Sequence, residues 1–242
     1  MRRVAAIAAL SIVLAACVAA PPRNPLATWV PSPNHELRRP ILIVLHATEQ
    51  DSVQESLDTL RSRNGGGPVS AHYLIGRDGH RYQLVADHDR AWHAGAGRWG
   101  TITDVNNASI GIELDNDGRA PFPPQQIDSL LELLEDLCTR LRIPRTQIIA
   151  HADMAPTRKV DPGAKFPWQR LADAGFGDWP NDMQGSPPPG FDPWIALRLF
   201  GYPLDDRPAA VRAFHLRFRG IDSEVLDGED LRILHALTRG AQ

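Results

Sequence analysis

The sequence predicts an α/β domain with a mixed central β-sheet flanked by helices, followed by a small all-α domain of three helices. Between residues 35 and 178, short apolar runs of strand character alternate with amphipathic helical stretches. After residue 192 the apolar residues recur only at helical spacing, from Trp194 to Leu237. The Pro- and Gly-rich segment 179–192 between the two parts is expected to be a linker.

The composition is that of an ordinary soluble globular protein. The 242 residues, 43% apolar and 23% charged, allow one large domain or a medium domain with a small one. The net charge of -3 gives no reason to expect a nucleic-acid partner.

The first half of the α/β domain contains three expected strands and a helix. The continuous apolar run 41–45 predicts a central strand that is buried on both faces. A helix is expected from about Ser52 to Arg63, where a run of glycines follows. Residues 72–75 and 81–85 predict a hairpin, because the turn sequence Gly-Arg-Asp-Gly joins them.

The second half of this domain repeats the alternation. Residues 109–114 predict a strand, residues 123–141 an amphipathic helix, and residues 148–150 a last short strand. Cys138 falls on the apolar side of the helix and is expected to be a core residue.

The N-terminus is expected to be a targeting signal rather than part of the fold. Two arginines precede an apolar stretch that ends Leu-Ala-Ala-Cys at Cys17, a pattern similar to a bacterial lipoprotein signal. We therefore expect cleavage after residue 16, lipidation of Cys17 and a tether over residues 17–34 in which prolines block regular structure. The alternative is an ordinary secretory signal with an incidental cysteine. By resemblance to sorted lipoproteins, Val18 in place of Asp implies an outer-membrane lipoprotein facing the periplasm of a Gram-negative bacterium.

Two histidines and an aspartate are candidate metal ligands. His46 and His151 each close an apolar run, and Asp161 follows ten residues after the second histidine. Two imidazoles and a carboxylate, with a fourth position left for water, make a catalytic Zn²⁺ set rather than a structural one. The sequence therefore predicts a metal-dependent hydrolase.

Glu113 and Lys159 are the candidate catalytic residues. Lys159 lies two positions before Asp161, and in an extended segment such residues share a face, so its ammonium is expected near the metal and an oxyanion. Glu113 ends a buried-looking strand, where a carboxylate is costly unless it is used, and it can act as general base and acid. The neighbouring Gly111 indicates a close backbone approach or a bulge.

Five segments, in this order along the chain, resemble the zinc-dependent N-acetylmuramoyl-L-alanine amidases. They are Val44–Thr48, Ser70–Ile75, Ala91–Gly95, Asn106–Leu114 and His151–Gly163. That family shares its fold with T7-type lysozyme and the peptidoglycan recognition proteins. The resemblance covers about residues 40–175 and implies cleavage of the amide between N-acetylmuramic acid and L-alanine in peptidoglycan or muropeptides.

The resemblance also implies roles for single residues. It makes His46, His151 and Asp161 the zinc ligands, Glu113 the general base and acid, and Lys159 the oxyanion stabiliser. His93 resembles a family residue that lines the substrate groove, and Arg158 is a weaker candidate for binding a stem-peptide carboxylate.

The C-terminal residues 193–242 resemble a three-helix peptidoglycan-binding module. The likeness is carried by Leu197–Tyr202, Ala210–His215 and Asp227–Gly228. Where that module usually has Phe-Gln, this chain has Phe214-His215, and the usual Gly-Leu is Gly220-Ile221. The unit is therefore expected either to bind cell wall or to support the fold.

Two other functions stay open at this point. A non-catalytic peptidoglycan receptor would use the same groove without needing Glu113 or Lys159, and a zinc peptidase would cut within the stem peptide. A lipid-anchored monomer is the simplest assembly.

Overall fold

The computed structural model describes residues 23–180, 183 and 185–239. The predicted signal peptide and Cys17 lie outside the described residues. Within the described residues, no helix has both the length and the apolar character needed to cross a bilayer.

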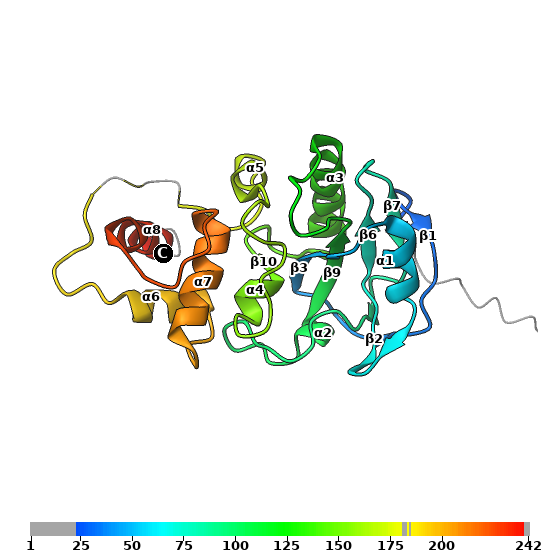
Figure 1. Cartoon of the computed structure of the whole chain (residues 1–242), viewed down its shortest axis with the longest axis horizontal. Helices are drawn as coiled ribbons and strands as arrows, with labels where there is room; N and C mark the ends of the chain where they lie inside the picture. The colour runs from blue at the N-terminus through cyan, green and yellow to red at the C-terminus, as the bar shows by residue number, and fades with distance from the viewer. Residues whose placement is uncertain (1–22, 181–182, 184, 240–242) are drawn as a thin grey trace, which may run out of the picture.

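A mixed β-sheet of six strands lies at the centre of the described residues, which confirms the predicted fold class (Figure 1). The strands lie in the order β1-β7-β6-β9-β3-β10. β6 and β7 pair antiparallel as the expected hairpin, and the other neighbouring strands of this sheet pair parallel. The bounds are β1 Thr28–Trp29, β3 Leu42–Ala47, β6 Tyr73–Ile75, β7 Arg81–Gln83, β9 Ser109–Leu114 and β10 Ile148–Ala150.

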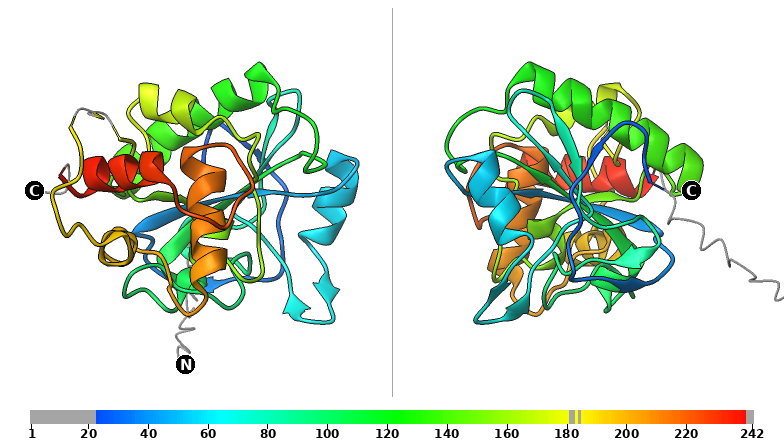
Figure 2. Two further views of the ribbon diagram at one scale, coloured as in Figure 1. Left: turned by 60° about the vertical axis from the view of Figure 1, so that its left-hand side comes forward. Right: turned by 90° about the vertical axis from the view of Figure 1, so that its right-hand side faces the viewer.

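Helices α1 (Val53–Thr59) and α3 (Pro124–Leu141) lie on different sides of the sheet (Figures 1 and 2). Alternate residues of β6 face them, as the twofold period of a strand requires. Tyr73 and Ile75 belong to the main core, which includes the buried side of α3, while Leu74 belongs to a second core with Leu57 of α1. Cys138 lies buried in the main core as expected.

The sheet extends further toward the N-terminus than the prolines of residues 17–34 suggest. Thr28–Trp29 form β1, which pairs with β7, and the side-chain amide of Asn24 donates to the carboxylate of Asp136 in α3. Two residues are too short a run to show a strand period, so this edge strand leaves no pattern in the sequence.

Helix α1 ends four residues earlier than predicted. The Ser52 hydroxyl caps its start by accepting from the Glu55 amide, as the sequence indicates. At the other end the Ser62 hydroxyl donates to the Thr59 carbonyl, and the glycine-rich stretch forms a two-stranded hairpin instead of a loop. The remaining short elements are β2 Glu36–Leu37, β4 Arg63–Asn64, β5 Gly67–Pro68, β8 Asp89–Arg90, α2 Val105–Ala108, α4 His151–Met154 and α5 Trp168–Asp173.

The described residues after 185 form the three expected helices, α6 Pro193–Phe200, α7 Arg207–Phe218 and α8 Gly228–Arg239. They pack beside β10 and α4, at the opposite edge of the sheet from β1 (Figure 1). Leu197 and Phe214 belong to the same hydrophobic core as the sheet. The domain boundary at residues 179–192 stays a prediction, since the apolar packing continues across it.

A buried ion pair joins the helical unit to α4. Arg217 of α7 donates to Asp153 over 2.7 Å, and the Tyr202 hydroxyl donates to the other oxygen of the same carboxylate over 2.8 Å. Both Arg217 and Asp153 are buried. The backbone amide of Ala150 also donates to Asp153, so this carboxylate holds the turn from β10 into α4.

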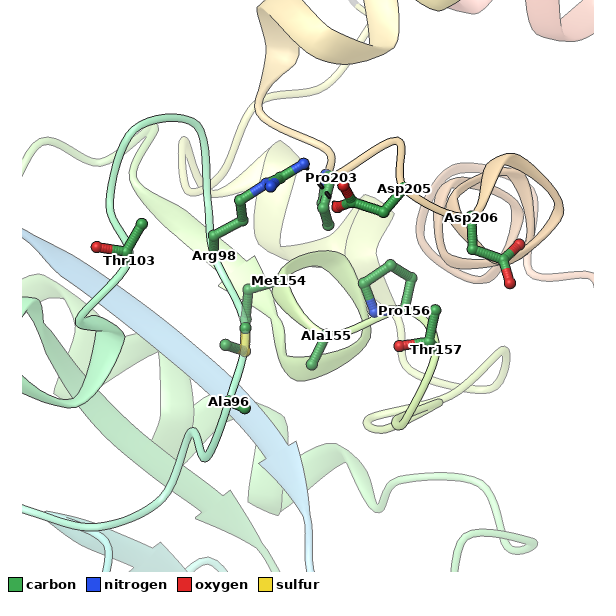
Figure 3. A pocket seen from close by; sticks show the side chains of 11 residues that line it. Ala96, Arg98, Thr103, Met154, Ala155, Pro156, Thr157, Pro203, Asp205 and Asp206 are labelled. Carbon is green, nitrogen blue, oxygen red and sulfur yellow. Dashed lines mark ion pairs between the residues drawn. The ribbon is translucent and has the colours of Figure 1, made fainter.

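A pocket of about 290 Å³ lies where the loop after α4 meets the loop before α7. Met154 and Pro156 line the pocket, and two further lining residues, Arg98 and Asp205, form an ion pair (Figure 3). Arg217 and Tyr202 join the buried parts of the two units, and the pair of Arg98 with Asp205 joins them at the pocket.

Candidate active site

The predicted site residues meet at the carboxyl ends of three parallel strands, where open α/β sheets bind their ligands. His46 in β3 and Glu113 in β9 are directly paired neighbours, so their side chains lie on one face of the sheet. His151 is the first residue of α4, directly after β10, and Asp161 lies in the following loop. The face is the one that α1 partly covers.

His46, His151 and Asp161 form a compact cluster. The Nδ1 atoms of the two histidines are 2.9 Å apart, and Asp161 Oδ2 lies 3.1 Å from His151 Nδ1 and 3.3 Å from His46 Nδ1. All three side chains are buried. A tetrahedral ion with ligands at about 2.0–2.1 Å would hold those atoms about 3.3 Å apart, so the cluster can hold a metal ion.

The hydrogen bonds around His151 favour a cation in this cluster. His151 Nε2 lies 2.9 Å from the carbonyl oxygen of Ala94, which can only accept, so Nε2 carries the proton. In the neutral ring Nδ1 then presents a lone pair to the Asp161 carboxylate and to His46. Electron pairs that face one another without a proton between them are stabilised by a metal ion, and the carbonyl partner is typical of a metal-binding histidine.

The pKa values of this cluster favour the metal-binding protonation states. Burial lowers the pKa of His46 to about 4, with a further contribution from the neighbouring His151. Burial alone would raise the pKa of Asp161, but its interactions with His151 and His46 outweigh burial and hold that pKa below its usual value. At neutral pH the cluster therefore offers neutral imidazole at His46 and a carboxylate at Asp161, as metal binding needs.

Glu113 lies beside the cluster with an unused oxygen. Its Oε1 is 3.9 Å from His46 Nδ1, and its buried Oε2 has no hydrogen-bond partner among the described residues. The pKa of Glu113 is raised to about 8, chiefly by burial and also by the charge of Asp161, while the charge of Lys159 opposes the rise. A carboxyl group that titrates near neutral pH can both accept and release a proton.

Lys159 lines the same pocket of about 180 Å³ as the cluster and Glu113. The helical turn after α4 positions it, since its backbone amide donates to the Ala155 carbonyl. Other walls of the pocket, which the sequence did not indicate, come from Thr48, Glu49, Gln50, Thr59, Leu60 and Val69. The pocket thus combines a metal-binding cluster, a carboxyl group and an ammonium.

His93 and Arg158 both lie near the cluster and form hydrogen bonds with other protein groups. The ring nitrogens of His93 contact His46 and Ser109, and burial lowers the pKa of His93 well below its usual value. The Arg158 guanidinium donates to the carbonyl of Ala94 over 3.0 Å and also to the carbonyl of Ala96. Their predicted contacts with substrate stay predictions.

Gly111 allows a close approach between β9 and His93. A Cβ atom at this position would lie 2.4 Å from the imidazole ring of His93, far inside van der Waals contact. The register of β9 with β3 is continuous through Gly111, so close approach, one of the two expectations, is the reason for the glycine.

The central part of the chain matches a known family. Residues 36–164, more than half of the chain, match the family described as N-acetylmuramoyl-L-alanine amidase. The chain belongs to this amidase family. The resemblance to this family is therefore confirmed, and all five candidate metal-binding and catalytic residues lie inside the matched segment.

Amidases of Gram-negative bacteria are among its relatives. The chain is 42% identical over 156 residues to the N-acetylmuramoyl-L-alanine amidase AmiD of Escherichia coli. The matched stretch covers 58% of this chain and 55% of AmiD. The chain is also 42% identical over 103 residues to the 1,6-anhydro-N-acetylmuramyl-L-alanine amidase AmpD of Haemophilus influenzae. This stretch covers 42% of the chain and 56% of AmpD. The chain thus spans a little over half the length of these two amidases.

Solved amidase structures share the fold over most of the chain. AmiD from E. coli, solved with anhydro-N-acetylmuramic acid-L-Ala-D-γ-Glu-L-Lys, superposes with a TM-score of 0.74 at 33% identity and covers 84% of this chain and 90% of its own. AmpDh3 from Pseudomonas aeruginosa, solved with anhydromuramic pentapeptide, has a TM-score of 0.72 at 33% identity and covers 85% and 93%. These coverages exceed the α/β part, so the amidase fold shared with them includes residues of the helical unit.

Proposed function

We propose that this amidase-family chain is a zinc-dependent enzyme that hydrolyses the amide between N-acetylmuramic acid and L-alanine in peptidoglycan or muropeptides. The observation that carries the proposal is the cluster of His46, His151 and Asp161 with Glu113 and Lys159 in one pocket. The relatives solved with muropeptides support this class of substrate.

Each group has a distinct part in the proposed reaction. His46, His151 and Asp161 would hold the zinc ion, which when bound supplies a Lewis acid and acidifies an attacking water. Glu113 accepts a proton from that water through its free oxygen and returns it to the alanine nitrogen as the C–N bond breaks. The Lys159 ammonium stabilises the negative charge that develops on the carbonyl oxygen.

The two alternative functions account for fewer of these residues. A receptor that only binds cell wall needs neither a carboxyl group with a raised pKa nor an ammonium beside a metal-binding cluster. A zinc peptidase could use the same groups, so the bond that is cut must be identified directly.

Product analysis tests the proposal. We expect purified protein with zinc to release intact stem peptides from muropeptides, as seen by mass spectrometry, because the cut lies before L-alanine. Fragments of the stem would indicate a peptidase, and unchanged muropeptides would indicate a receptor.

His151→Ala is expected to lose both zinc, measured by elemental analysis, and turnover, whereas Glu113→Ala is expected to keep zinc and lose turnover. Stoichiometric zinc in His151→Ala would contradict the ligand set.

The proposed location is the periplasmic face of the outer membrane. Cys17 would carry the lipid, which would leave a monomeric enzyme attached by the N-terminal segment. Labelled palmitate should enter the full chain expressed in a Gram-negative host and should be absent from Cys17→Ala. Incorporation into that variant, or none into the wild type, would contradict the lipoprotein assignment.

A further inference from the structure

The dipeptide His93–Ala94 contacts both histidines of the metal-binding cluster. The His93 side chain places Nδ1 3.0 Å from His46 Nε2, and the Ala94 carbonyl oxygen lies 2.9 Å from His151 Nε2. One short segment outside the cluster therefore reaches the outer nitrogen of each ligand histidine.

The proton positions along the His46 contact follow from the far end of a hydrogen-bond chain. The Ser109 hydroxyl lies 2.5 Å from the carbonyl oxygen of Val105, which can only accept, so Ser109 donates its proton there. The Ser109 oxygen therefore presents a lone pair to His93 Nε2 at 3.2 Å, and Nε2 must carry a proton to bond it.

The same chain then fixes the tautomer of His46. Because His93 is buried and neither of its ring nitrogens contacts a carboxylate, its ring is neutral and its Nδ1 carries a lone pair. That lone pair accepts the proton of His46 Nε2. The Nδ1 atom of His46 is left with a lone pair aimed at His151 and Asp161, as a metal ligand needs.

A second residue holds the dipeptide in place. Asn106 Oδ1 accepts from the backbone amide of His93 over 3.0 Å and from that of Ala94 over 2.9 Å. Asn106 is itself buried, and the absent side chain of Gly111 makes room for the His93 ring. The position of the dipeptide is thus set from both its backbone and its side chain.

We propose that His93 and Asn106 are positioning residues that fix both ligand histidines in their metal-binding tautomers. The inference rests on the proposed metal centre. It gives His93 a role directed at the metal ligands, since both of its ring nitrogens bond within the protein. Loss of such an outer partner typically weakens metal affinity by about 10–100-fold.

Zinc affinity of the metal-free protein tests the role of His93. Competition with a chromophoric chelator should show a decrease of about 10–100-fold in affinity for His93→Leu. His93→Asn should recover much of it, because the Asn oxygen can take the place of Nδ1 and accept from His46. His72→Asn is the matched control and should keep the wild-type zinc affinity. His72 is also a buried histidine and lies beside His93, but the His72 ring bonds the backbone of Gly111 and Asp89 instead of a ligand histidine.

A milder pair of variants keeps the test valid if His93→Leu does not fold. Asn106→Leu removes the acceptor of two backbone amides and should lower zinc affinity, whereas Asn107→Leu, at the exposed neighbouring position, should leave it unchanged. The absorption spectrum of bound Co²⁺ should change in Asn106→Leu and not in Asn107→Leu, because it reports the ligand geometry.

The outcomes separate this inference from the proposed function. If the wild type binds zinc and both His93→Leu and Asn106→Leu bind it equally well, the positioning role is wrong. If His93→Asn is as weak as His93→Leu, the hydrogen bond to His46 is not the cause. If the wild type itself binds no zinc, the proposed metal centre fails instead.

Discussion

Glu113 is a buried carboxyl group with one oxygen unpaired among the described residues. With a pKa near 8 in the metal-free protein, it would be largely protonated at neutral pH, and only a small fraction would be in the carboxylate form that a base needs. A cation in the cluster beside it favours the carboxylate form. The metal-binding cluster and the general base are therefore coupled, and the carboxylate becomes available where a metal is bound.

We expect the buried Glu113 carboxyl to make the metal-free protein less stable as the pH rises. A carboxyl group titrates near 4.5 in the unfolded chain and near 8 here, so the folded state binds more protons between these values and stability falls with rising pH. Each unit of pKa difference is worth about 1.4 kcal/mol. Glu113→Gln removes this dependence. The unfolding free energy of the variant minus that of the wild type should therefore increase from pH 5 to pH 8.

Urea unfolding with a chelator present measures that difference. Glu224→Gln, at an exposed position, is the control and should follow the wild-type pH dependence. Parallel curves for Glu113→Gln and the wild type would show that the raised pKa is wrong.

The sequence could indicate the cluster but not what holds it in place. His46, His151 and Glu113 each lie at the end of an apolar run, and the carboxyl ends of parallel strands meet, so their proximity follows from a local pattern. The contacts of His93 with Ser109 and of Asn106 with two backbone amides are long-range and depend on packing. A loop side chain that bonds another backbone segment leaves no periodic signal.

At the scale of elements, the spacing of apolar residues and the length of each run decided which helices and strands could be predicted. β3, β9 and α3 have long apolar or amphipathic runs and were predicted within two residues of their bounds. β1 is only two residues long, and α1 ends before Ser62, whose hydroxyl donates to the Thr59 carbonyl. The ion pair between Arg217 and Asp153 joins two elements that no local pattern relates.

We expect Arg217→Met to destabilise the protein strongly, because it leaves the buried Asp153 carboxylate without its cation. Removing one partner of a buried ion pair typically costs about 3–5 kcal/mol. Arg212→Met is the matched control on the same helix, since Arg212 pairs with Asp222 at the surface, where such a pair is worth about 0–1 kcal/mol. Equal losses of unfolding free energy in the two variants, measured in urea, would contradict a structural role for Arg217.

At the scale of the whole molecule, the helical unit and the metal-binding cluster share one support. Asp153 lies two residues after His151 in α4 and accepts from both Arg217 and Tyr202 of the C-terminal unit. The main hydrophobic core runs from β3 through α4 to α7. A unit linked in this way has no separate core boundary at which it could unfold alone.

We therefore expect zinc to stabilise the helical unit as well as the sheet, in one cooperative transition. A ligand that binds only the folded state adds about 2.7 kcal/mol at a hundredfold excess over its dissociation constant. Hydrogen exchange measured by mass spectrometry should show that zinc slows exchange in α7 together with β3, although α7 contributes no residue to the cluster. In His151→Ala zinc should change neither, because the metal no longer binds. Slower exchange in β3 alone, with α7 exchanging at its metal-free rate, would show that the helical unit is an independent module.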